Sequence, residues 1–148
     1  MDMDQPRRWA VEVVPGADRD RLCPLPRHDV VPSRSIPPTA LAIAQAIRRV
    51  RTSARCGAAE HRDLFADPAW DMLLDLYVAE ATGRRVSVSD ACIAAAVPQA
   101  TALRWLNMLD QRGLVIRTAD QTDRRRWWMT LSDAGVALVE RMLPPTMT

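Results

Sequence analysis

Hydrophobic residues recur every three or four positions in several stretches of the chain. This spacing places them on one face of a helix. The clearest examples are residues 39–56 and 67–82, followed by residues 98–112 and 132–143. A brief Ala-rich helix is predicted over 90–96. The pattern therefore predicts a chain built mainly from helices.

Helix boundary signals stand at the ends of these stretches. Asp67 followed by Pro68 is a helix start, because the Asp side chain accepts from the first turn and proline suits the first helical position. Gly83 and Gly113 are placed to end helices, since glycine adopts a left-handed backbone at little cost. Ser89 is expected to cap the brief helix at 90–96.

The period changes after Gly113. Residues 114–118 and 127–131 are each predicted to be strands, joined by a polar turn that ends in three arginines, and residues 85–88 form a short extended piece. The order is then two helices with a tight turn between them, over 89–112, followed by a hairpin over 114–131. This order predicts a mainly α fold with a small β-hairpin (α+β), a winged helix-turn-helix domain spanning 39–148.

Residues 1–38 have a different composition. They hold seven of the 11 prolines, which lack a backbone donor and fix φ, so a continuous helix or a central strand is excluded there. Only residues 9–14 have strand character. We interpret this stretch as a proline-rich extended arm, with a loose tail as the equal alternative.

Charge is clustered although the net value is only +2 over 148 residues. Residues 39–66 hold five Arg against two acidic residues, and 97–131 hold six against three. The segment between them, 67–96, holds two Arg against five acidic residues. Every basic residue is Arg, which suits forked contacts to phosphate. One face of the domain is thus expected to meet a polyanion.

Other function classes find no support in the sequence. No apolar run reaches the ~20 residues of a membrane span, and the N-terminus does not resemble a secretory signal. Cys23, Cys56 and Cys92 form neither a zinc pattern nor a disulfide framework, and we expect a cytoplasmic protein without a metal or cofactor. The isolated His28 and His61 are interpreted as surface residues. No set of residues suggests an enzyme.

Four motifs occur in one register between Thr101 and Gly135. They are Thr101 followed by Arg104, the Gly-Leu-Val run that opens the hairpin, Asp-Arg-Arg at its tip, and a Leu-Ser-x-x-Gly that opens the next helix. The combination resembles the MarR family of bacterial regulators, over roughly residues 60–143. The resemblance implies a transcriptional regulator that binds palindromic double-stranded DNA as a homodimer.

The resemblance also implies positions on DNA. One group is expected at or near the major groove. A second group, on the hairpin over 114–131 that forms the wing, is expected at the minor groove or its phosphates. Asp123 is expected to orient a wing arginine. Ser89, at a predicted helix start, is expected to present backbone donors to a phosphate. The candidate DNA-binding residues are Ser89, Gln99, Ala100, Thr101, Arg104, Arg124, Arg125 and Arg126.

Partner surfaces are predicted on the first helix. Its apolar stripe is the candidate homodimer interface, formed by Ala40, Ile43, Ile47, Val50 and Ala54. Relatives of this type also bind small aromatic effectors, so such a partner is implied here. The alternative is a winged-helix module that binds another protein and no DNA, through the arm and this helix. Arg104 with Arg124 and Arg125 favours DNA.

Overall fold

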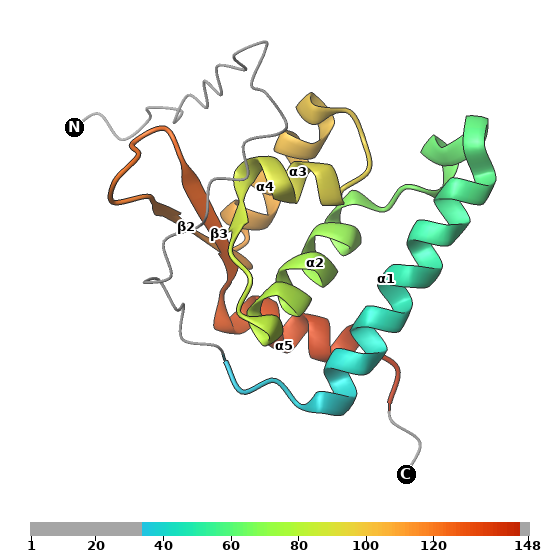
Figure 1. Ribbon diagram of the computed structural model, residues 1–148, viewed down its shortest axis with the longest axis horizontal. Coiled ribbons are helices and arrows are strands. Elements are labelled where there is room, and N and C mark those ends of the chain that lie inside the picture. Colours follow the sequence, from blue (N-terminus) through green and yellow to red (C-terminus); the bar gives the residue numbers. More distant parts are fainter. Residues whose placement is uncertain (1–33, 146–148) are drawn as a thin grey trace.

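The computed structural model describes residues 34–145. Within them the mainly α architecture with a small antiparallel sheet is confirmed (Figure 1). The elements in chain order are α1 (Pro38–Ala58), the 3-10 helix η1 (Ala59–Phe65), α2 (Pro68–Thr82), β1 (Val86–Ser87), α3 (Val88–Ala94), α4 (Gln99–Gln111), β2 (Val115–Ala119), β3 (Trp127–Leu131) and α5 (Asp133–Met142). The proposed strand at 9–14, Cys23, His28 and almost all of the arm lie outside the described residues.

α2 is the central helix. It contacts α1, α3, α4, β3 and α5, and it lies in the middle of the helices in Figure 1. Residues 71–79 are buried without a break, so both faces of this helix are covered. The predicted caps are confirmed, since the backbone N–H of Trp70 donates to Asp67 and Gly83 ends the helix with φ +72°. Both α4 and β3, a strand of the wing, pack against α2.

The sheet has the order β1-β3-β2, and both pairings are antiparallel. β2 and β3 form the predicted hairpin, in which Val115 pairs with Leu131 and Ala119 with Trp127. The short extended piece predicted at 85–88 is β1, which adds a third strand through Val86 opposite Met129. Trp128 is 8% exposed and Trp127 is 40% exposed, so the two rings lie on opposite faces of β3.

α5 starts against the first residues of the hairpin. Ser132 caps it, accepting from the backbone N–H of Gly135, and the Ser132 backbone N–H donates to the carbonyl of Leu114. A Cβ on Gly135 would lie 2.1 Å from that same carbonyl oxygen. The glycine of the Leu-Ser-x-x-Gly motif is therefore required by a close approach of α5 to the backbone of Leu114, just before β2.

α1 packs on α2 through a face that the apolar stripe did not predict. Ile43 and Ile47 of the stripe are half-buried against the core, but Val50 is 69% exposed and Ala54 is exposed. Leu41 and Ala44 begin the contact, and arginines continue it along the helix. The prediction of a helix is confirmed, and the face that packs on α2 is offset from the apolar stripe because it includes arginines that pair with carboxylates of α2.

Three of the four arginines of α1 are paired with two buried carboxylates on α2. Asp71 is 6% exposed and accepts from Arg51, with Nε to Oδ1 at 2.6 Å, and from Arg55, with Nη1 to Oδ2 at 2.9 Å. Asp75 is 5% exposed and lies 2.9 Å from Arg48 and 2.7 Å from Arg84. This is an ionic seam between two helices, and we call it the α1–α2 seam.

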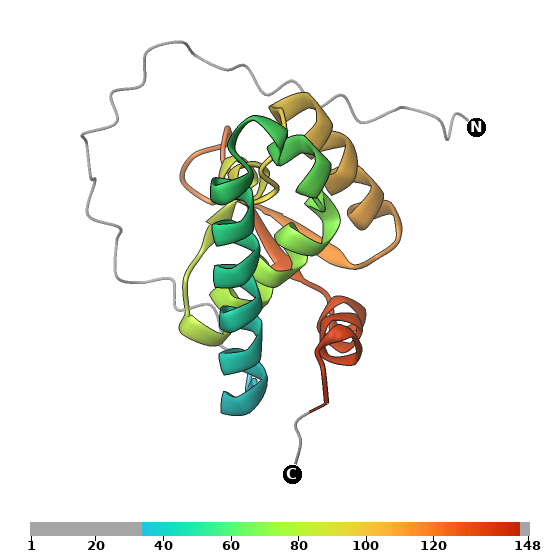
Figure 2. The ribbon, with the colours of Figure 1, turned by 90° about the vertical axis from the view of Figure 1, so that its right-hand side faces the viewer.

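α5 lies near the N-terminal half of α1 in two views at right angles (Figure 2). η1, at the opposite end of α1, exposes Leu64 at 73% and Phe65 at 56%. Within residues 34–145 no helix has the length and the apolar character that crossing a bilayer requires.

Candidate nucleic-acid interface

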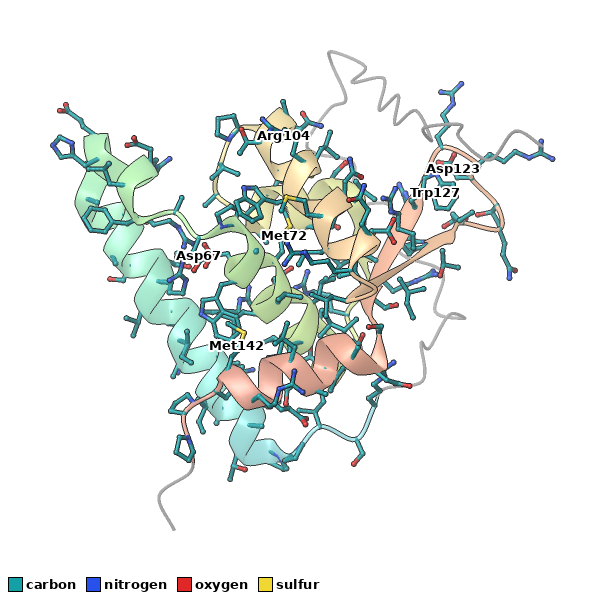
Figure 3. The ribbon with its side chains drawn as sticks, turned by 180° about the vertical axis from the view of Figure 1, so that it is seen from behind. Asp67, Met72, Arg104, Asp123, Trp127 and Met142 are labelled. Atoms are coloured by element: carbon teal, nitrogen blue, oxygen red, sulfur yellow. The ribbon has the colours of Figure 1, made fainter. Side chains whose placement is uncertain are left out.

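α4 presents a polar face to solvent. Ala102, Leu106 and Leu109 are buried, as their spacing predicted, and hold the helix on the core. The opposite face carries Gln99, Ala100 and Arg104, all exposed, with Thr101 half-buried between them. Figure 3 shows Arg104 on the outer side of this helix. The first turns of α4 therefore present a short row of mainly polar side chains to solvent, while the buried face anchors the helix.

A tight turn joins α3 to α4. Ala96 takes φ +56° in this turn, and Pro98 stands as the N-cap of α4 without a side-chain cap. The prediction of Ser89 as the cap of α3 is wrong. The cap is Ser87, whose hydroxyl accepts from the backbone N–H of Asp90 while the Asp90 carboxylate accepts from the backbone N–H of Ser87.

This reciprocal pair starts α3 earlier than predicted, because Ser and Asp three residues apart satisfy two backbone donors at once. Ser89 is exposed on the first turn of the helix. It lines a cleft that wing residues also border, but it does not cap α3.

Asp120 organises the wing tip. Its Oδ1 accepts from the backbone N–H and the hydroxyl of Thr122, both at 2.8 Å, and from the backbone N–H of Asp123 at 3.0 Å. Its Oδ2 accepts from the indole Nε1 of Trp128 at 2.8 Å. The hydrogen bonds, first of all those from Thr122, hold the pKa of the Asp120 carboxyl well below its usual range. The tip is thus a folded turn.

Asp123 was expected to orient an arginine, and its contact is with the main chain. Its Oδ1 accepts from the backbone N–H of Arg125 at 3.0 Å, and its carbonyl accepts from that of Arg126 at 3.0 Å. The side chains of Arg124 and Arg125 are exposed, and in the described part of the chain they form no ion pair. The wing therefore offers guanidinium groups to an outside partner.

Arg117 ties the wing to α4. Its side chain is 7% exposed, and its Nη2 donates to Asn107 at 3.1 Å and to Asp110 at 2.9 Å. These partners lie on α4, and Arg117 lies on β2. No sequence motif indicated this contact, because it joins residues whose proximity depends on how the hairpin folds back.

The predicted residues lie on α3, on α4 and at the tip of the wing. Arg104 on α4 and Asp123 at the wing tip both lie in the upper part of Figure 3, while Met142 of α5 lies in the lower part. Cys92 is a small core residue on α3, Cys56 is exposed, and His61 is exposed as its interpretation as a surface residue predicted. Among residues 34–145 there is no group of three His, Cys, Asp or Glu side chains fit to hold a metal ion.

Comparison with known proteins finds similarity only among solved structures. No family model matches the chain, and no curated protein matches it. MepR of S. aureus, in a DNA-binding conformation, is 22% identical, with a TM-score of 0.47 over 66% of this chain and 72% of that one. A mutant of MarR from E. coli is 19% identical, with a TM-score of 0.45 over 73% and 74%.

A third similar structure is BpsR of Bordetella bronchiseptica, whose DNA binding is regulated by 6-hydroxynicotinic acid. It is 27% identical, with a TM-score of 0.42 over 70% of this chain and 63% of that chain. The similar structures are MarR-family regulators. They are proteins of the kind that the motifs of this sequence resemble. At these scores no residue role is carried over, and the interface rests on the chain's own geometry.

Proposed function

We propose that this chain is a sequence-specific DNA-binding transcriptional regulator. α4 enters the major groove with Gln99, Ala100, Thr101 and Arg104, and the wing reaches the minor groove or the backbone through Arg124, Arg125 and Arg126. The observation that carries the proposal is the exposed polar face of α4 beside a folded wing whose tip arginines are left to solvent. A helix of this width fits the major groove, and base edges there are read by such side chains.

The proposed regulator acts as a homodimer. Ile43, Ile47 and Val50 form an apolar edge of α1 that the fold leaves partly or largely exposed. α5 lies near the N-terminal half of the same helix, and its Met142 is also exposed. A two-fold interface over this edge would present two α4 helices to successive turns of the major groove.

The test is binding of the full chain to DNA from upstream of its own gene and to a shuffled duplex of the same composition, over a salt series. Mass is measured on the same samples. We expect dimer mass, preference for the upstream duplex, and affinity that falls steeply with salt. Equal, weak binding to both duplexes would refute sequence-specific recognition.

A second candidate is a winged-helix module that binds a protein. The observation in its favour is the exposed pair Leu64 and Phe65 at the end of η1, since large apolar residues in contact with water often mark a protein interface. This candidate predicts that the chain ignores DNA, and that exchanging both residues for Ser abolishes its partner contact. The regulator predicts that the same exchange leaves DNA affinity unchanged.

A further inference from the structure

β2 has a sheet partner on one side only among residues 34–145. The order β1-β3-β2 places it at an edge, next to β3, and it lies at the margin of the ribbon in Figure 1. The strand at the opposite edge, β1, is two residues long, whereas β2 has five. An edge strand presents a row of backbone N–H and C=O groups that another strand can bind. Within the described chain, β2 is the edge with room for such a strand.

The register of the hairpin shows which backbone groups of β2 face away from β3. The backbone N–H of Ser132 donates to the carbonyl of Leu114 at 3.0 Å, and the next pair along the ladder is Val115 with Leu131. Bonded and non-bonded pairs alternate along an antiparallel ladder, so the even-numbered residues of β2 bond to β3. The backbone groups of Val115 and Ala119, at the two ends of β2, therefore point to its outer side.

The side chains of β2 give its outer edge none of the usual protection. Natural edge strands are commonly shielded by a proline, a bulge or an outward-pointing charge. β2 has no proline and pairs with β3 without a bulge, and the side chain of Arg117 is 7% exposed and bound to α4. The remaining side chains are apolar or threonine, and Ile116 is 46% exposed. A strand of this composition favours a further strand beside it.

The described chain begins at the end of the sheet where β2 starts. Arg34 Nη2 lies 2.9 Å from Asp133 Oδ1, and its Nε lies 3.6 Å from Glu80 Oε2. Glu80 also accepts from the backbone N–H of Leu131 at 2.7 Å, and Leu131 is paired with Val115, the first residue of β2. These contacts fix the point from which the N-terminal arm joins the domain.

One segment of the arm has the sequence pattern of a strand. Residues 9–14 read Trp-Ala-Val-Glu-Val-Val, which is rich in the β-branched and aromatic residues that favour strands. Trp9, Val11 and Val13 stand at alternate positions, with Glu12 among the intervening residues. Alternation of this kind is typical of a strand with one face on the protein and the other in water. The segment has six residues, which matches the length of β2.

We propose that residues 9–14 add to the outer edge of β2 as an antiparallel strand of the same chain. Residues 15–33 connect this segment to Arg34 and can span up to about 60 Å, whereas β2 is about 17 Å long. In the antiparallel direction Val14 lies at the Val115 end of β2, so the connecting residues leave and return at one end of the sheet. The wing then belongs to a four-stranded sheet. This pairing does not require DNA and is independent of the proposed function.

The test is nuclear magnetic resonance on the isotope-labelled full chain. We expect short proton–proton distances between residues 9–14 and β2, in the order of an antiparallel pair. A sample mixed from labelled and unlabelled chains shows whether these distances lie within one molecule. Distances between molecules would assign the segment to the β2 of a second copy and overturn the proposal. Proximity to β1, or to neither edge, would overturn it as well.

A proline variant tests the same pairing by hydrogen exchange. Val11→Pro removes a backbone donor from the segment and disfavours a strand there, so the exposed Ala119 should exchange its amide hydrogen about tenfold faster or more. The matched control is Val30→Pro, which places proline in the connecting residues and should leave this rate as in wild type. Thermal unfolding verifies that both variants are folded. Equal rates at Ala119 in wild type and Val11→Pro would show that the segment does not bind β2.

Discussion

Two groups of three arginines on this chain have opposite environments. Arg48, Arg51 and Arg55 on α1 are bound to the buried carboxylates of Asp71 and Asp75. The three arginines at the tip of the wing are exposed, and two of them form no ion pair in the described part of the chain. The residue type is the same, and so is the excess of three positive charges in each sequence window.

The difference lies in the partners that the fold supplies. α2 brings two carboxylates one helical turn apart against α1, so each of these three α1 arginines has a carboxylate partner within the molecule. The wing has Asp120 and Asp123 within a few residues of its arginines, yet both carboxylates accept from backbone N–H groups. Charge excess along a sequence therefore locates a polyanion surface only after internal pairing is subtracted.

The largest effect is expected for Asp71→Ala in the seam. Removing this carboxylate leaves Arg51 and Arg55 half-buried without their partner, and the free energy of unfolding should fall by about 3 kcal/mol. Denaturant unfolding measures it. Asp63→Ala, an exposed carboxylate on η1, is the control and should change stability by less than about 0.5 kcal/mol. Equal, small losses in both variants would show that the seam contributes little.

The next effect is expected for Arg104→Ala on α4. If its guanidinium donates to a base edge, discrimination between the upstream and shuffled duplexes should fall by about 1–3 kcal/mol with stability unchanged. Competition binding measures the discrimination. Arg112→Ala, exposed at the other end of α4, is the control and should leave it intact. Uniform weakening on both duplexes would reassign Arg104 to a phosphate.

A smaller effect on energy, with a distinct signature, is expected for the double variant Arg124→Ala with Arg125→Ala. Affinity for both duplexes should fall equally, and the salt slope should decrease by about two units. The free energy of unfolding should change by less than about 0.5 kcal/mol, because neither side chain has an ion-pair partner among residues 34–145. The control is Arg49→Ala with Arg62→Ala, both exposed. An unchanged slope would remove the wing from the interface.

The smallest effect is expected from salt on folding. The pairs of the α1–α2 seam are mostly withdrawn from water and are weakly screened, so raising salt from about 50 to about 300 mM should lower unfolding free energy by less than about 1 kcal/mol. Over the same range the DNA affinity should fall by about tenfold or more. Parallel loss of stability and affinity would contradict the distinction between the two arginine groups.

Much of the fold could be predicted from spacing and caps. Asp67, Gly83 and Gly113 bound helices where local rules place them, because capping depends on the backbone of a few neighbours. The N-cap of α3 was missed although its signal is local, since Ser87-Val88-Ser89-Asp90 carries the serine and the acid three residues apart.

The α1–α2 seam and the contact between Arg85 and Trp128 could not be predicted from the sequence, because each depends on how distant segments pack. Asp71 and Asp75 lie on an otherwise apolar stretch, which indicates buried carboxylates, yet the sequence does not say which arginines reach them. The stacking of Arg85 on Trp128 joins residues far apart in the chain. The exposed rows of α4 and the wing tip needed only periodicity and polarity, so those parts of the interface could be proposed beforehand.

The buried Arg117 links the wing to α4 through hydrogen bonds to Asn107 and Asp110. Its two hydrogen bonds fix the separation between the helix and the hairpin, so the protein half of the complex has little freedom to adjust its span. On the proposed function the DNA must then deform to fit the protein. Sequences whose groove width already matches the spacing between α4 and the wing cost the least deformation energy. Such a protein would distinguish among DNA sites by their stiffness at base pairs that no side chain touches.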